Sequence, residues 1–349
     1  MAKYSIGGQA LIEGVMMRGP KKVALAVRNA SKTMVVKEWE HEGDNKPKVF
    51  KIPFVRGIFN FIDSMKVGYK TLMISADIAM EYDEDDENNP DYKSKDSIDN
   101  NLEERDDNPK NSTENSDKVE IDVDKTEKKE ENSGLLMTIL MTISSIIGVL
   151  LAIALFLWLP TFLYNLFKKA VPVMDTRYYQ SIFEGVLKIT IFVVYVALVS
   201  LMEDMRRVFM YHGAEHKTIF CYEHGMELTV ENVKKQSRFH PRCGTSFMAL
   251  MLIISIFVGL FIPHDIPGIL RVGIKLLCIP IVMGIGYEAI KLAGRKNNLF
   301  VRIISAPGLW IQRITTKEPT DDMIECAITS FKAVLPEDAW EEDENKEDK

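Results

Sequence analysis

The sequence predicts a mainly α-helical, polytopic membrane protein with a small N-terminal β unit. Three observations lead to this fold class. Four apolar stretches are long enough to cross a bilayer, acidic and basic residues are segregated along the chain, and the first 50 residues hold Val-rich runs between glycines. An amphipathic helix is expected after the β unit, and a cytoplasmic loop rich in His, Glu and Cys between the second and third transmembrane helices.

These features divide the chain into eight segments. They are the β unit (1–50), the amphipathic helix (51–80), an acidic linker (81–133), the first two transmembrane helices (134–202), the cytoplasmic loop (203–246), the last two transmembrane helices (247–293), a cytoplasmic C-terminal segment (294–335) and an acidic tail (336–349).

Residues 1–50 are expected to form a small β unit. Lys22–Arg28 and Thr33–Glu40 are rich in Val and partly alternate apolar with polar residues, and residues 29–32 between them read as a turn. The glycines at positions 7, 8, 14 and 19 are interpreted as turns and points of close packing. Their spacing does not match a phosphate-binding fingerprint.

Residues 51–80 are predicted to form an amphipathic helix. Ile58, Ile62 and Met65 recur at helical spacing, while Asp63 and Lys66 belong to the polar remainder. Two interpretations stay open. The helix either lies on the membrane surface or packs as a core helix against the β unit.

The charges of the chain are strongly segregated. Residues 81–133 contain 21 Asp and Glu against 8 Lys and Arg, and residues 336–349 contain 8 against 2, so the rest of the chain is basic although the net charge is −7. The two acidic segments are too polar to build a core and are expected to be disordered. The basic body predicts an anionic lipid bilayer as neighbour, and no motif indicates a nucleic-acid partner.

The four expected transmembrane helices run from Leu135 to about Phe167, from Ile182 to Leu201, from Phe247 to Ile262 and from Ile269 to about Leu292. Segments 204–246 and 291–317 carry seven and six Lys and Arg, against three in 168–181 and none in 263–268. The positive-inside rule therefore places the loop, the C-terminal segment and both termini in the cytoplasm.

Three ionisable residues lie inside the predicted spans. Glu184 and Lys188 are four residues apart and are expected to pair, and Lys275 is expected to reach toward the membrane surface. We interpret all three as structural, because an ion pathway would need more such groups near the midplane.

The loop contains the residues best suited to chemistry. On a helix, His212 and His216 lie one turn apart and can share one divalent ion, with Glu215 free as a proton carrier. The string fits the H-x-x-E-H pattern of some zinc metalloproteases. His240 and Cys243 supply further ligands if the neighbouring spans pack together.

The number of ligands separates two uses of a zinc ion. If His212, His216, His240 and Cys243 all bind it, the site is closed and structural. If only one of His240 and Cys243 binds, a position stays open for water, and Glu215 can act as general base. A third interpretation has no metal, with ordinary interfacial histidines and a buried thiol.

Several strings together resemble one family. They are the segment GGQALIEGVMMRGP from Gly7 to Pro20, YHGAEHK from Tyr211 to Lys217, ELTVEN from Glu227 to Asn232 and HPRCGTS from His240 to Ser246. On these motifs the chain resembles the YqhQ-like bacterial integral membrane proteins, a group of unknown function predicted to depend on metal. The resemblance implies a multi-pass protein of the bacterial inner membrane. It also suggests that Glu13 and Arg18 lie near the metal ligands, because they share the signature.

The leading functional hypothesis is a zinc-dependent hydrolase that acts on a membrane peptide or a lipid-linked substrate. The alternative is a non-enzymatic membrane factor that binds a protein translocation, insertion or quality-control complex, with any metal structural. An ion or solute carrier is a weaker third hypothesis, because few polar groups line the spans.

Overall fold

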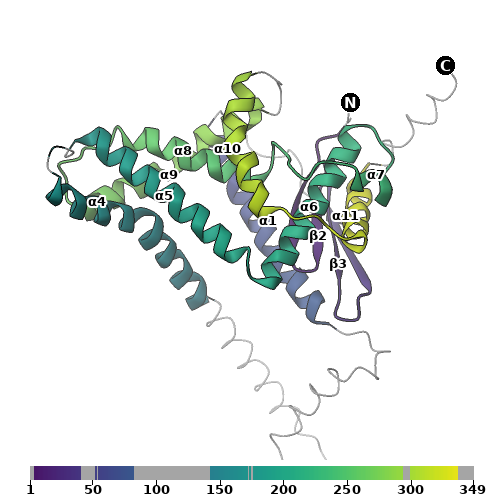
Figure 1. The fold of residues 1–349 in the computed structure, drawn as a ribbon. Helices are drawn as coiled ribbons and strands as arrows, with labels where there is room; N and C mark the ends of the chain where they lie inside the picture. Colours follow the sequence, from purple (N-terminus) through teal and green to yellow (C-terminus); the bar gives the residue numbers. More distant parts are fainter. Residues whose placement is uncertain are drawn as a thin grey trace, which may run out of the picture. The chain divides into compact units, whose positions relative to one another are not determined.

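A computed structural model describes residues 4–40, 52, 54–81, 142–171, 173, 176–293 and 299–336. The chain divides into two compact units, Glu84–Leu159 and a larger one made of Met1–Asp83 and Pro160–Lys349. The described residues are mainly helical, with one antiparallel sheet near the N-terminus (Figure 1). Nearly all of the predicted acidic linker and tail lies outside the described residues.

The sheet is a four-stranded meander of β1 (Gly7–Leu11), β2 (Gly14–Arg18), β3 (Lys22–Arg28) and β4 (Met34–Glu40), in the order β1-β2-β3-β4. The predicted strands 22–28 and 33–40 are confirmed. The early glycines are predicted to form turns and points of close packing. The turns are wrong for Gly7, Gly8 and Gly14, which belong to paired strands, whereas close packing is confirmed for Gly8 and Gly14. Gly14 is opposite Val27, where a Cβ would come within 2.2 Å of the carbonyl oxygen of Ala26.

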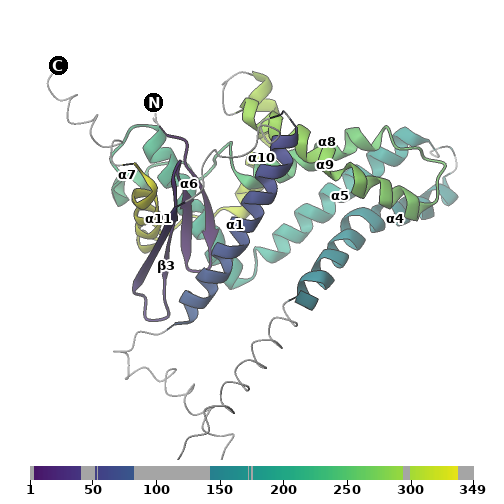
Figure 2. The ribbon, with the colours of Figure 1, turned by 180° about the vertical axis from the view of Figure 1, so that it is seen from behind.

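Helices cover both faces of the sheet. α6 (Glu203–Glu223) and α11 (Asp321–Val334) pack on one face, and α1 (Val55–Met80) packs on the other (Figures 1 and 2). Alternate residues of β3 serve the two cores: Ala24 and Ala26 join the α6/α11 side, whereas Leu25 and Val27 join the α1 side. A strand that is buried on both faces is expected to have an almost uninterrupted apolar sequence, and β3 has such a sequence.

The predicted amphipathic helix is α1, and it is a core helix along much of its length. Ile78, which is 1% exposed, packs with the sheet residues Leu11 and Leu25. The opposite face remains exposed and carries Phe59 and Met65. The packing of α1 on the β unit is thus confirmed. Contact of its exposed apolar face with a membrane surface stays a prediction.

Among the described residues, three helices are long and apolar enough to cross a membrane, rather than the expected four. They are Thr142–Ala170, α5 (Arg177–Val199) and the part of α9 (Gly268–Ala293) up to Lys291. The first includes the π-helical turn η2 (Ala154–Trp158) just before α4 (Leu159–Ala170). The third predicted span is α8 (Gly244–Gly259), an apolar helix of only 16 residues.

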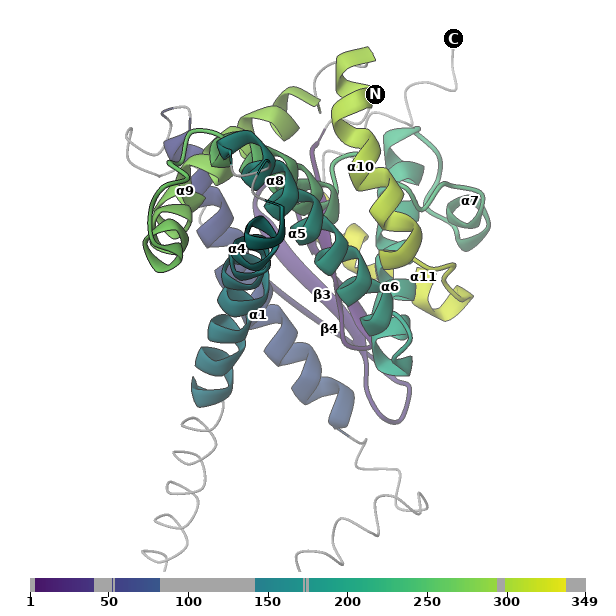
Figure 3. The same cartoon turned by 60° about the vertical axis from the view of Figure 1, so that its left-hand side comes forward.

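The second span ends before the histidine segment begins. α5 ends at Val199, and α6 begins at Glu203 after Met202 takes an extended backbone conformation (ψ 134°). This break redirects the chain, so that α6 lies on the sheet. Two further helices complete the described chain (Figure 3): α7 (Val230–Lys234) and α10 (Leu299–Thr315).

Candidate metal centre

α6 brings the two histidines together, as their spacing predicts. The neighbouring Tyr211 and Ala214 are fully buried in the core between α6, α11 and the sheet. This packing fixes the rotation of the helix, so His212 and His216 share one side with their ring centroids 4.4 Å apart. His212 stays partly exposed, whereas the side chain of His216 is 2% exposed.

Backbone carbonyl oxygens orient both imidazole rings. His212 Nδ1 lies 2.8 Å from the carbonyl oxygen of Thr315, and His216 Nδ1 lies 2.6 Å from that of Arg238. Because a carbonyl oxygen can only accept a hydrogen bond, each Nδ1 carries the proton and donates it. In a neutral ring each Nε2 then presents its lone pair, which is the usual arrangement of metal-binding histidines.

Cys243 completes a group of three potential ligands. It caps the first turn of α8, and its Sγ lies 3.1 Å from His212 Nε2. One ligand atom each from His212, His216 and Cys243 lies within 4.8 Å of the others. His216 Nε2 is buried without a hydrogen-bond partner among the described residues. A buried nitrogen with a free lone pair, beside a thiol and a second imidazole, fits a divalent metal.

Glu215 lies next to the two histidines, between them and strand β1. Its Oε2 lies 3.8 Å from the Nε2 atoms of both His212 and His216. The backbone N–H of Gly8 in β1 donates to its carboxylate, and burial raises the pKa of Glu215 above its usual value. A Cβ on Gly8 would lie 2.6 Å from Glu215 Cγ, so the residue at this point of β1 must be small.

Gly213 permits an equally close contact on the other side of α6. A Cβ there would come within 2.0 Å of the carbonyl oxygen of Lys317, whose N–H donates to the carbonyl oxygen of Phe209 at 2.8 Å. The chain at 315–317 can therefore approach α6 closely enough for Thr315 to hold His212. In the string from His212 to His216, the glycine is as necessary to the geometry as the histidines.

His240 is not one of the group formed by His212, His216 and Cys243. Its Nε2 lies 3.4 Å from Glu223 Oε2, and its backbone N–H donates to Gln312 Oε1 at 2.7 Å. Burial lowers the pKa of His240 despite that contact. Burial also opposes the ionisation of Glu223, but His240 and Arg242 outweigh it and hold the Glu223 pKa below its usual value. His240 therefore lies outside the group of His212, His216 and Cys243, next to the ring of His216.

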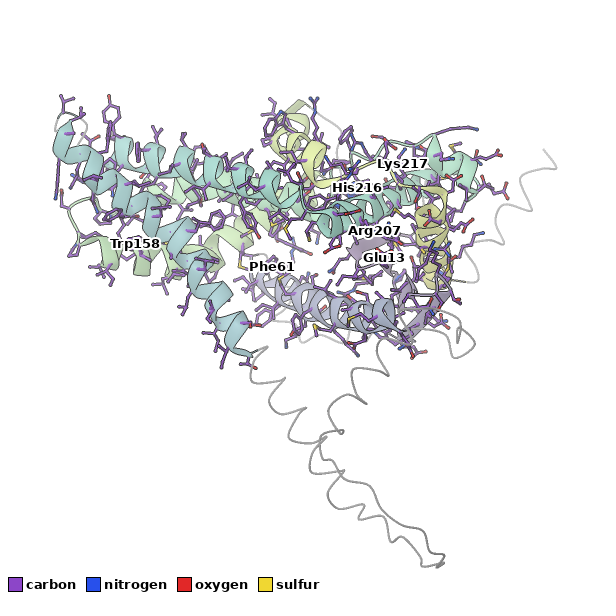
Figure 4. All side chains as sticks on the ribbon, turned by 60° about the horizontal axis from the view of Figure 1, so that its bottom comes forward. Glu13, Phe61, Trp158, Arg207, His216 and Lys217 are labelled. Atoms are coloured by element: carbon purple, nitrogen blue, oxygen red, sulfur yellow. The ribbon has the colours of Figure 1, made fainter. Side chains whose placement is uncertain are left out.

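Glu13 and Arg18 pair elsewhere. Glu13 accepts hydrogen bonds from Nε and Nη2 of Arg207, with Oε1 2.5 Å from Nε, and from the Tyr211 hydroxyl at 3.4 Å. Figure 4 shows Arg207 and Glu13 side by side along α6, apart from His216. Arg18 donates to Asp63 of α1 at 2.8 Å. Within the N-terminal signature, Gly8 is the residue that contacts the histidine cluster through Glu215.

Sequence reasoning missed the supporting residues. Thr315, Arg238 and Gly8 act through backbone atoms, and such roles leave no side-chain pattern in a sequence. Gln312 is buried and bridges the backbone of His240 and the Ser246 hydroxyl. A glutamine among the apolar residues of α10 is the sequence signal that points to such a structural role.

The comparisons with known proteins agree with the motif resemblance. A family described as a protein of unknown function (DUF1385) matches residues 52–337. The chain is 33% identical over 352 residues to the uncharacterized protein YqhQ of Bacillus subtilis (strain 168), covering 99% of this chain and 98% of the relative. No solved structure matches.

Proposed function

The chain belongs to the family described as a protein of unknown function (DUF1385), and we propose that it is a multi-pass, zinc-dependent membrane hydrolase. In this proposal His212, His216 and Cys243 hold the metal and Glu215 is the general base. The substrate class is a membrane peptide or a lipid-linked group. The observation that carries the proposal is the pair of imidazoles whose Nδ1 atoms donate to backbone carbonyls, leaving both Nε2 atoms beside one thiol.

In this proposal the chain crosses the bilayer four times. α8 is 16 residues long, about 24 Å, which is less than the roughly 30 Å of a hydrocarbon core. It packs along α9, with Gly286 of α9 against Phe247 and Met251 of α8, so the two form a hairpin that enters the bilayer together. The Lys and Arg distribution supports an orientation with α6, the metal centre and both termini on the cytoplasmic side of the bacterial cell membrane.

The chemistry follows from the donor set. A zinc ion held there would act as a Lewis acid and lower the pKa of an attacking water to about 7. Glu215 is placed to accept the proton of that water, because its carboxylate faces both imidazoles from outside the three-ligand group. Gly8 holds the carboxylate through its N–H, and the partial exposure of His212 leaves one approach from solvent.

Metal content tests the first step. Purified full-length protein should contain one zinc per chain by elemental mass spectrometry, and His212→Ala and Cys243→Ser should each lose it. His224→Ala is the matched control, because His224 lies at the end of the same helix and bonds to Gln236 Oε1 at 2.8 Å. A parent protein without stoichiometric metal removes the hydrolase proposal.

Glu215→Gln tests the second step. The amide keeps the shape of the side chain but cannot take a proton, so zinc should stay bound while turnover falls about 10²- to 10⁴-fold. Turnover would be followed on membrane extracts by mass spectrometry of released peptides or head groups. Unchanged turnover in this variant rules out Glu215 as the base.

One observation favours the non-enzymatic alternative. Glu215 Oε2 is equally far, 3.8 Å, from the two Nε2 atoms, so a small shift would make it a fourth ligand and close the site. Zinc would then only fasten α6 to α8 in a factor that serves another membrane complex. In that case Glu215→Gln weakens metal binding, whereas a general base leaves metal binding unchanged.

A further inference from the structure

A second group of buried polar side chains lies among α4, α5, α8 and α9, in the half of α5 farther from α6. Glu184 of α5 contacts Lys275 Nζ at 2.7 Å and Arg271 Nε at 3.3 Å, both from α9. Lys275 also donates to the Thr161 hydroxyl of α4 at 2.7 Å. The pair expected between Glu184 and Lys188 is replaced by these bonds, and Lys188 donates instead to Ser255 of α8 at 3.2 Å.

The charges of this cluster do not balance among the described residues. Lys188 lies within electrostatic range of both Glu184 and Lys275, so three cations share one carboxylate. The nearby Asp265 is exposed and pairs with His264 at 2.8 Å. Arg271 is 1% exposed and Glu184 is 4% exposed. An excess of positive charge among apolar helices is unfavourable unless an anion accompanies it.

The unpartnered atoms point to the same place. Of the five buried side-chain nitrogen and oxygen atoms without a partner among the described residues, three belong to this cluster: Arg271 Nη2, Ser181 Oγ and Gln180 Oε1. Another is His216 Nε2 in the candidate metal centre. Such atoms are rare in folded proteins, and each calls for an explanation such as strain, a bound water or a bound ion.

The two free donors belong to one corner of the bundle. Arg271 Nη1 donates to the carbonyl oxygens of Ile262 and Pro263, which follow the end of α8, at 3.3 and 2.6 Å. Ser181 packs at the end of α8 as well, with its Oγ 3.6 Å from where a Cβ on Gly259 would be. A guanidinium N–H and a hydroxyl are thus available there.

We propose that this cluster binds the phosphate group of an anionic phospholipid. A guanidinium presents its donors in a planar fork that suits a tetrahedral oxyanion, and a hydroxyl and an ammonium group add further donors. The unpartnered Gln180 Oε1 can accept a hydrogen bond from a hydroxyl on the head group. Apolar residues beside the cluster are open to the surroundings, with Ile182 53%, Val186 57% and Leu270 52% exposed, which suits acyl chains.

The test uses delipidated, full-length protein in neutral detergent. Phosphatidylglycerol, phosphatidylcholine and inorganic phosphate are titrated separately, with binding followed by thermal unfolding and stoichiometry by native mass spectrometry. One tightly held phosphatidylglycerol is expected, with phosphatidylcholine much weaker. Lys188→Gln should weaken phosphatidylglycerol binding about tenfold, the usual effect of losing a charged hydrogen bond.

Two further variants sharpen the result. Arg177→Gln removes a charge from the exposed start of the same helix and should leave the affinity unchanged. Ser181→Ala removes a buried hydroxyl without a partner, so it should raise the Tm of the lipid-free protein while it weakens phosphatidylglycerol binding.

Equal binding of both lipids, or equal effects of Lys188→Gln and Arg177→Gln, overturns the proposal. If inorganic phosphate stabilises the protein as much as phosphatidylglycerol does, the cluster binds phosphate but the ligand is not a lipid. The outcome is independent of the hydrolase proposal, because His212→Ala should not change lipid affinity.

Discussion

Replacing Gly213 by alanine probes how tightly the chain packs behind the candidate metal centre. Gly213 lies between the two histidines in the middle of α6, and alanine is favoured over glycine in a helix by about 1 kcal/mol. Helix propensity alone therefore predicts a more stable protein. The structure predicts the opposite, because the new Cβ would lie 2.0 Å from the carbonyl oxygen of Lys317.

The size of the effect follows from that contact. Backbone atoms cannot swing away as a flexible side chain can, and overpacking typically costs about 1–3 kcal/mol. A 2.0 Å contact with backbone calls for the upper end of that range, about 2–3 kcal/mol. Subtracting about 1 kcal/mol of helix preference leaves a net loss of roughly 1–2 kcal/mol, or a fall in Tm of about 2–8 °C. The displaced segment also carries Thr315, whose carbonyl orients His212, so zinc affinity should fall about 10- to 100-fold.

Thermal unfolding and competition for zinc with a chelator measure the two effects. Gly244→Ala is the control, because Gly244 adjoins Cys243 and an added Cβ would meet nothing within 4 Å. If Gly213→Ala matches Gly244→Ala in both Tm and zinc affinity, the reasoning about this close approach is refuted.

Three further predictions concern individual side chains. His240→Ala should keep its zinc by elemental analysis, because His240 Nε2 faces Glu223; loss of metal would make it a ligand. Lys217→Met should cost about 1–3 kcal/mol in thermal unfolding, since the Lys217 ammonium donates to the carbonyl oxygen of Lys234 at 2.9 Å and lies 2.8 Å from Glu318 Oε2; an unchanged Tm contradicts this. Burial raises the pKa of Cys326 from 9.0 to about 11, so stability measured by denaturant unfolding should decline between pH 9 and pH 11, and Cys326→Ala should remove that component.

Local patterns were enough for several elements. The Val-rich runs predicted β3 and β4, and the helical spacing predicted α1. Of the four apolar stretches predicted to cross a membrane, three form described helices of membrane-spanning length. The interval of four residues between His212 and His216 was enough to place their rings side by side. Each of these features depends on neighbours along the chain.

Contacts between distant segments decided the rest. The glycine-rich strands β1 and β2 were missed, because glycine signals turns locally, whereas Gly14 meets Ala26 across the sheet and Gly8 meets Glu215. The break between α5 and α6 also has no local signal, because no Pro or Gly marks it.

The sequence by itself determined which residues could hold a metal and which helix presents the two imidazoles, because helical periodicity is a short-range property. Only the tertiary structure decided that Cys243 joins them, that His240 turns to Glu223, and that Arg271 and Lys275 share Glu184. The physical reason is that a ligand set requires side chains far apart in the chain to meet within a few ångströms. Their meeting depends on how whole helices and strands pack, which no local pattern records.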